Sequence, residues 1–151
     1  MKDTAKHLAL AEKSCLKQGS CLTLKRKQVL NILLHADKAI SAYEVIDAYQ
    51  SEYHETLAPM SAYRMLEFLE KVKLIHKLHI ANKYVACSHI GCEHDDELTY
   101  FLFCHKCQRV DEIPSQSTSL PELVDSVAKA GYQLSSSQIE LNCICNACAN
   151  D

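Results

Sequence analysis

The sequence predicts an α+β protein in which an N-terminal winged-helix domain is followed by a small α/β domain with a four-cysteine zinc site. Three observations predict this fold class. Apolar residues recur at helical spacing through the first half, and two short strand-like runs follow them. The second half reads as two strands, a helix and a last strand. It also contains two Cys-x-x-Cys pairs, Cys104–Cys107 and Cys145–Cys148.

The first two helices are expected over residues 2–18 and from Thr23 onward, because Gly19 suits a helix end and Thr23 can cap a helix start. The apolar side of the first helix comprises Leu8, Ala11, Cys15 and Leu16. The apolar side of the second comprises Leu24, Val29, Leu30, Leu33 and Leu34.

Two further helices and a hairpin complete the first half. Ser41 and Glu44 have the spacing of a capping box and open the third helix. Pro59 opens the fourth, which continues to about residue 71. Strands are expected over 74–80 and 83–87, split by a turn. Helices followed by such a hairpin are typical of a winged helix, whose helix over 61–70 would enter the major groove of DNA.

The second half begins with the polar, acidic residues 88–98, which we interpret as a linker. Strands are expected over 99–103, 109–113 and 132–144, and a helix over 120–130, ended by Gly131. The predicted domains are therefore 1–87 and 99–151, joined by the linker.

Charge separates the two halves. Residues 1–83 contain 13 Lys and Arg against 9 Asp and Glu, whereas residues 84–151 contain 3 against 10. A basic first half suits a nucleic-acid partner, although chance clustering also explains a moderate asymmetry. No run is apolar for long enough to cross a membrane, and the charged N-terminus does not read as a signal peptide. Nine cysteines without a secretory signal favour metal binding in a reducing cytoplasm.

The two Cys-x-x-Cys pairs favour a structural Zn²⁺ site. Each pair places two thiolates on one side of a turn, and four thiolates close a tetrahedral site. A redox-active pair is the alternative, but it needs a helix N-terminus directly after a strand. Cys143 lies close enough in sequence to compete with Cys145 as a ligand, whereas His105 is expected to face solvent.

A second group of possible ligands spans the hairpin, the linker and the second half. It comprises His76, Cys87, His89, Cys92, Glu93, His94, Asp95, Asp96, Glu97 and Glu112. Mixed His, Cys and carboxylate ligands suit Zn²⁺ and would clamp the two domains together. An acidic, solvated loop with incidental His and Cys residues explains the same spacing equally well.

Several segments resemble the ferric uptake regulator superfamily of metal-dependent repressors over nearly the whole chain. They are Leu22-Thr-Leu-Lys-Arg26, Ile40-Ser-Ala-Tyr-Glu44, Pro59-Met-Ser-Ala-Tyr-Arg64 and the two Cys pairs. Within the superfamily the chain is most similar to the zinc-sensing members, because a thiolate at Cys87 is a soft ligand that favours zinc. Leu24 stands where proline is usual, and Ser61-Ala62 where Thr-Val is usual.

The resemblance implies a homodimer, with the winged helix binding DNA and the second domain dimerising. It also implies two Zn²⁺ per monomer. Cys104, Cys107, Cys145 and Cys148 match the structural site. His76, Cys87 and Glu112 match three ligands of the regulatory site, and His94 is our choice for the fourth, with His89 and then Cys92 as alternatives. The linker lacks the run of His residues that a third site would use.

The function implied is a cytoplasmic, zinc-responsive repressor of zinc uptake genes that binds a palindromic operator. The residues expected at the DNA are Lys25, Arg26, Tyr43, Ser61, Tyr63, Arg64 and Lys77, with Lys27 and Lys83 as further phosphate contacts. Arg64 can offer a bidentate contact to guanine, or can pair with Glu67 or Glu70 instead.

Three other functions stay open. The scaffold could sense iron, manganese or peroxide, or it could be a zinc-stapled protein-interaction module without a DNA role. A zinc deaminase is disfavoured, because the sequence has no His-x-Glu motif and no proline before either Cys pair. We therefore do not expect an enzyme.

Overall fold

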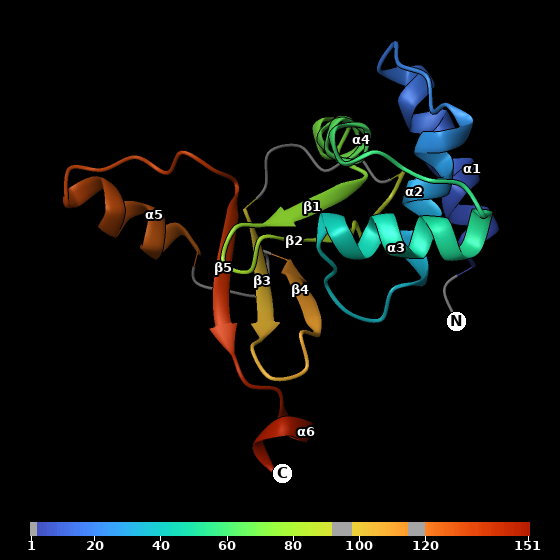
Figure 1. Ribbon diagram of the computed structural model, residues 1–151. Helices are drawn as coiled ribbons and strands as arrows, with labels where there is room; N and C mark the ends of the chain where they lie inside the picture. The colour runs from blue at the N-terminus through green and yellow to red at the C-terminus, as the bar shows by residue number, and fades with distance from the viewer. Residues whose placement is uncertain (1–2, 92–97, 115–119) are drawn as a thin grey trace. The chain divides into compact units, whose positions relative to one another are not determined.

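In the computed structural model, which describes residues 3–91, 98–114 and 120–151, the chain divides into the units Met1–Cys92 and Glu93–Asp151 (Figure 1). The described elements of the first unit are α1 (Thr4–Lys17), α2 (Leu24–His35), α3 (Ala42–Tyr53), α4 (Pro59–Lys71), β1 (Ile75–Leu78) and β2 (Lys83–Ala86). Those of the second are β3 (Thr99–Cys104), β4 (Val110–Pro114), α5 (Leu120–Lys129), β5 (Gln138–Cys143) and α6 (Asn146–Ala149). None of the described helices is long and apolar enough to span a membrane.

The predicted starts of α2, α3 and α4 are confirmed, and the first two have side-chain caps. The Thr23 hydroxyl accepts a hydrogen bond from the Arg26 amide at 3.4 Å. The Ser41 hydroxyl accepts from the Glu44 amide at 3.2 Å, while the Glu44 carboxylate accepts from the Ser41 amide at 2.6 Å. Pro59 is the first residue of α4. Each cap satisfies backbone N–H groups that the first helical turn leaves without a partner.

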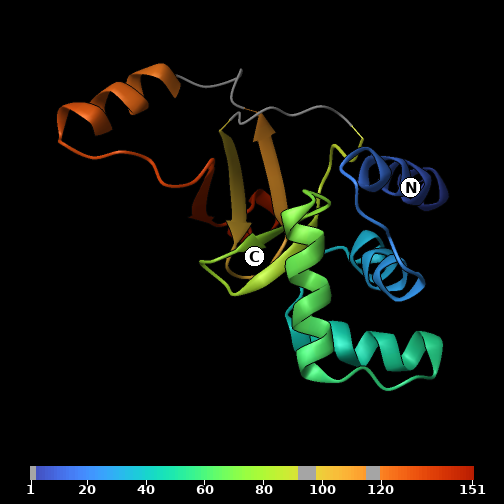
Figure 2. The ribbon, with the colours of Figure 1, turned by 90° about the horizontal axis from the view of Figure 1, so that it is seen from above.

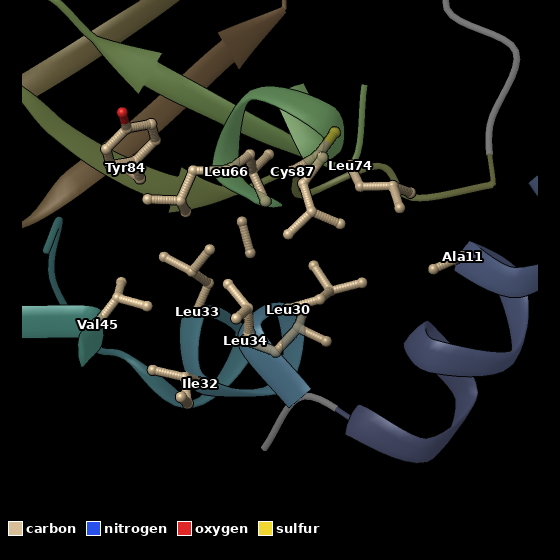
Figure 3. Close-up of a cluster of buried hydrophobic side chains, with 14 of the residues drawn as sticks. Ala11, Leu30, Ile32, Leu33, Leu34, Val45, Leu66, Leu74, Tyr84 and Cys87 are labelled. Carbon is tan, nitrogen blue, oxygen red and sulfur yellow. The ribbon is translucent and has the colours of Figure 1, made fainter. Parts of the chain in front are cut away.

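An apolar core lies between α2, α3, α4 and the hairpin, and α1 packs against α2 (Figure 2). Leu30 and Leu33 of α2 face Leu66 of α4, and Cys87 lies beside Leu74 (Figure 3). None of the described residues buried in this unit is polar or charged. Apolar burial is therefore the main contribution to this core, to which the Tyr49 hydroxyl adds a hydrogen bond to Gln28 Oε1 at 2.8 Å.

Two residues predicted on the apolar helix sides are not in the core. Leu16 is 71% exposed and Leu24 is 70% exposed. Leu16 follows the buried Ala11 by five positions, and Leu24 precedes the buried Val29 by five. Five residues turn a helix by about 140° beyond one full circle, so both side chains point away from the core. The prediction for these two positions was wrong.

The hairpin and a short bridge form the wing of the first unit. β1 and β2 pair antiparallel from Ile75 opposite Ala86 to Leu78 opposite Lys83. Asn82 in the turn has a φ of 50°, a left-handed conformation that Asn adopts more readily than most residues. Ile40 pairs with Tyr84 on the other side of β2. The expected hairpin is thus confirmed.

The second unit is built on a three-stranded sheet in the order β4–β3–β5. β4 is antiparallel to β3, and β5 returns parallel to it after a crossover that contains α5. The expected strand over 132–144 begins only at Gln138, whose partner Thr99 is the first residue of β3. The Ser136 hydroxyl accepts a hydrogen bond from the Gln138 amide, a local bond that competes with a strand ladder. The strand prediction for 132–137 was wrong.

Candidate metal centre and DNA-binding surface

Four cysteine sulfurs converge in the second unit. The Sγ atoms of Cys104, Cys107, Cys145 and Cys148 all lie within 4.8 Å of one another. The Sγ atoms of Cys107 and Cys145 are 3.8 Å apart. Zinc–sulfur bonds of about 2.3 Å place the corners of a tetrahedron about 3.8 Å apart, so the four thiols fit a structural Zn²⁺. Neither Cys143 nor His105 belongs to this group.

Strand pairing brings the two pairs together. Cys104 is the last residue of β3 and lies opposite Cys143, the last residue of β5. Residues 105–107 then turn back, and the Gln108 amide donates to the Cys104 carbonyl at 2.8 Å. After β5 the chain continues directly into Cys145, which precedes the short helix α6. The parallel register therefore sets the spacing between the two Cys-x-x-Cys turns.

Backbone amides prepare one of these thiols for metal binding. The Cys145 amide donates to Cys104 Sγ at 3.3 Å. Hydrogen bonds from the amides of Cys107 and Cys145 lower the pKa of Cys104 from 9.0 to about 6. The pKa of Cys148 changes in the opposite direction. Hydrogen bonds from its thiol to the sulfurs of Cys145 and Cys107 stabilise the protonated form and so raise the pKa. The lowered pKa favours the thiolate form of Cys104, and thiolates are the species that bind metal.

The residues expected at the regulatory site are divided between the two units. Cys87 extends the β1–β2 ladder, since its amide donates to the Leu74 carbonyl at 2.9 Å. His76 lies opposite Val85, two residues before Cys87, so His76 and Cys87 are on the same face of the hairpin. Cys87 is 7% exposed, and the Nε2 atom of His76 is also shielded from solvent.

The other expected ligands lie elsewhere. The His89 amide donates to Cys87 Sγ at 3.4 Å, which keeps His89 beside this face. Glu112 is on β4 of the second unit, opposite Phe101. His94 and Cys92 lie outside the described residues, as do Glu93, Asp95, Asp96 and Glu97. The structure therefore brings two of the four expected ligands to one face, and the set as a whole stays a prediction.

Most of the residues expected at DNA lie near the starts of α2, α3 and α4, whereas Lys77 lies on β1 and Lys83 on β2. Tyr43 is the second residue of α3 and is 63% exposed. Ser61, Tyr63 and Arg64 lie in the first two turns of α4, and Arg64 is exposed. Within the described part of the chain no ion pair joins Arg64 to Glu67 or Glu70. A hollow of about 570 Å³ separates the starts of α2 and α4, lined by Thr23, Leu24, Lys25, Arg26, Ser61, Arg64 and Met65.

Several of the basic residues already have partners within the first unit. Lys83 pairs with Glu44 at 3.1 Å, and Lys27 pairs with Glu12. Lys25 reaches Glu55 at 3.8 Å, with both side chains more than half exposed. Exposed pairs of this kind are weak, so Lys25 can exchange its partner for a phosphate.

Arg26 has a more specific environment. Its guanidinium carbon lies 3.6 Å from the centre of the Phe68 ring, and Nη1 donates to the Cys21 carbonyl at 2.9 Å. The same charge opposes the burial that raises the pKa of Cys15. Sequence reasoning missed Phe68 as a partner of Arg26, because the two residues lie on different helices and no spacing in the sequence relates them.

Known proteins match the chain over nearly all of its length. The model of the ferric uptake regulator family matches residues 17–142. The zinc uptake regulation proteins of Escherichia coli (strain K12) and Shigella flexneri are each 32% identical over 146 residues, which covers 96% of this chain and 82% of theirs.

Solved structures also match the chain over nearly all of its length. A zinc uptake regulator complexed with zinc and DNA superposes with a TM-score of 0.84 at 29% identity, covering 99% of this chain and 97% of the other. The structure of holo XcZur superposes with a TM-score of 0.79 at 28% identity, covering 98% and 99%.

Proposed function

The chain belongs to the ferric uptake regulator family, and from this premise we propose that it is a zinc-responsive, DNA-binding transcriptional repressor of zinc uptake genes. One observation carries the proposal. The fold matches a zinc uptake regulator in complex with zinc and DNA over 99% of the chain. The relatives are regulators and not enzymes, and the four thiols close a site without an open position for a substrate. Action on DNA places the proposed activity in the cytoplasm.

α4 is the element that would read the DNA sequence. In a helix-turn-helix the N-terminal residues of the recognition helix contact base edges. Arg64 is exposed, and its planar guanidinium can donate two hydrogen bonds to the O6 and N7 acceptors of guanine. Ser61, Tyr63 and Tyr43 would contact phosphates or a thymine methyl group. Lys25 and Lys77 would bind phosphates and make the affinity depend on salt.

The second unit would join two copies of the chain. Leu123 and Val124 of α5 are 38% and 42% exposed, and Leu141 of β5 is 43% exposed. A helix of strongly one-sided character needs a surface to cover its apolar side, and a second copy supplies one. A homodimer would present two α4 helices, which suits a palindromic operator.

Two Zn²⁺ per monomer are proposed, with different tasks. Cys104, Cys107, Cys145 and Cys148 would hold a structural ion that stabilises the second unit. His76, Cys87, Glu112 and His94, or His89 in its place, would hold the regulatory ion. A shared ion would link ligands from both units and so restrict how the winged helix moves. DNA affinity then rises because the competent pose is already populated.

A metal titration of DNA binding tests the proposal. The probe is a 30-base-pair duplex selected by the zinc-loaded protein from a random pool, and binding is followed by fluorescence anisotropy. We expect Zn²⁺ to raise affinity and a chelator to reverse the effect. If Fe²⁺ or Mn²⁺ restores binding at a lower free concentration than Zn²⁺, the chain is an iron or manganese sensor of the same family. If no metal-dependent binding is found, the protein-interaction alternative gains support.

A further inference from the structure

Arg26 is fixed at three points in the first unit. Its amide donates to the Thr23 hydroxyl, which sets where the side chain leaves the helix. Nη1 donates to the Cys21 carbonyl at 2.9 Å, and the guanidinium stacks on Phe68 with its carbon 3.6 Å from the ring centre. A planar guanidinium held by a ring and a carbonyl has little of the freedom that a surface lysine keeps.

The ring beneath Arg26 belongs to the recognition helix. Phe68 follows Arg64 by four residues, so the two side chains lie one above the other on the same face of α4. Arg26 and Arg64 also line the same hollow. Phe68 is partly buried against the core, and Arg26 covers one face of its ring.

This arrangement has a consequence for Arg64. An arginine four residues before a phenylalanine on a helix can fold onto the ring. In that conformation the guanidinium of Arg64 would no longer reach the DNA. In this protein another guanidinium already occupies the ring, and its like charge repels Arg64 from that position. With no ion pair to Glu67 or Glu70 in the described chain, Arg64 is left to extend outward.

We propose that Arg26 is a positioning residue that keeps Arg64 extended for base contact, and that it does not act chiefly as a phosphate ligand. The proposal rests on the DNA-binding function above and adds a specificity-determining residue to it. A phosphate ligand and a positioning residue differ in measurable ways. Loss of a phosphate contact lowers the salt slope of log K by about 0.9 and weakens all sequences equally. Loss of a positioning residue weakens only the selected sequence and leaves the slope unchanged.

A double-mutant cycle separates the two roles. The probes are the selected 30-base-pair duplex and a scrambled duplex of the same composition, both with zinc-loaded dimer. We expect Arg26→Lys to lower the preference for the selected duplex by about two- to fivefold, the strength of an arginine stacked on a partly exposed ring. In an Arg64→Ala background the same change should have no effect. An equal loss in both backgrounds would overturn the proposal.

Three further variants keep the test decisive. Arg26→Gln removes the charge, and we expect its salt slope to match the wild type, whereas a slope lowered by about 0.9 overturns the proposal. Lys25→Ala is the matched control at the neighbouring cation and should weaken both duplexes alike. Phe68→Leu removes the ring onto which Arg64 could fold, so in a Phe68→Leu background Arg26→Lys should no longer lower the preference for the selected duplex. Circular dichroism checks that each variant is folded.

The proposed function is tested separately in the first step. A wild-type protein that selects no duplex in the presence of zinc overturns both proposals. A wild-type protein that binds normally, combined with an Arg26→Lys loss independent of Arg64, overturns only the positioning role.

Discussion

The two units of this protein are held together by different means. In the first unit, helices and a hairpin enclose an apolar core, and this unit contains all but three of the described buried hydrophobic residues. The three in the second unit are Phe101, Phe103 and Cys104. The second unit has a sheet with few buried side chains, an exposed α5 and a cluster of four thiols. Domains of this size bury only a modest apolar surface, and a metal or a partner often supplies further stability. We infer that metal dependence of folding is confined to the second unit.

The largest expected effect comes from breaking the thiol cluster. Cys107→Ser removes one of four ligands of a site whose occupancy contributes about 10–16 kcal/mol in small zinc domains. We expect a monomeric protein that has lost one zinc, while the helices of the first unit persist. Analytical ultracentrifugation, metal analysis and far-ultraviolet circular dichroism measure the three properties. Cys21→Ser, at an exposed cysteine outside the cluster, is the control. A Cys107→Ser protein that stays dimeric with full zinc would contradict the comparison.

A core substitution should produce the converse result. Leu66 is fully buried in the first unit, and Leu66→Ala is expected to lower the free energy of unfolding by about 2–5 kcal/mol. Urea unfolding followed by circular dichroism measures the loss, and the zinc held by the thiol cluster should remain. Leu24→Ala is the matched control, because Leu24 is 70% exposed and its truncation should change stability by less than about 0.5 kcal/mol. Loss of the thiol-bound zinc in Leu66→Ala would show that the units do not fold independently.

Cys87→Ser tests the proposed link between the units. We expect a folded dimer with the thiol cluster filled, in which zinc no longer raises DNA affinity. Loss of a metal ligand should weaken zinc binding at the regulatory site by at least about 100-fold, since even supporting residues of metal sites contribute 10- to 100-fold. Calorimetric zinc titration and anisotropy provide the measurements. Cys15→Ser controls for burying a hydroxyl, because Cys15 is also buried in the core. If Cys87→Ser responds to zinc like the wild type, Cys87 is not a ligand.

The smallest effect concerns acid stability of the first unit. The hydrogen bond from the Ser41 amide, aided by Lys83, lowers the pKa of Glu44 below its usual 4.5. A carboxyl group with a depressed folded pKa stabilises the protein above its unfolded pKa, and this contribution is lost as pH falls through the folded pKa. Glu44→Gln should therefore lose less stability than the wild type between pH 5 and pH 3, by under about 1 kcal/mol for a partly exposed group. Urea unfolding at both pH values measures the change in the free energy of unfolding, and Asp47→Asn is the control. If the wild type and Glu44→Gln lose the same free energy of unfolding between pH 5 and pH 3, the proposed role of Glu44 is wrong.

Local chemistry made much of the fold predictable. The caps at Thr23 and Ser41 and the proline at the start of α4 depend on neighbours in sequence, so the helix starts were correct. The prediction for Leu16 and Leu24 failed because composition does not say which side of a helix meets the core. The short helix α6 was missed because its four residues are too few to show a periodic pattern.

The candidate sites also divide into those set by local sequence spacing, which were predictable, and those set by tertiary packing, which were not. Cys-x-x-Cys spacing predicted the thiol cluster, because each turn brings two sulfurs together regardless of the fold around it. The stacking of Arg26 on Phe68 was not predictable, because it joins α2 to α4 through tertiary packing. The regulatory ligands come from both units and from the linker, and His94 lies outside the described residues, so that set stays a prediction.

The parallel pairing of β3 with β5 has a kinetic consequence. Thr99 meets Gln138 only after the chain has passed through β4 and the whole crossover, so a long loop must close before this contact forms. The first unit depends mainly on contacts between neighbouring helices and a tight hairpin. Folds dominated by non-local strand pairing assemble more slowly than those built from local contacts. We therefore expect the winged helix to be complete while the second sheet is still forming, so that a newly made chain has its DNA-reading surface before it can pair with another copy.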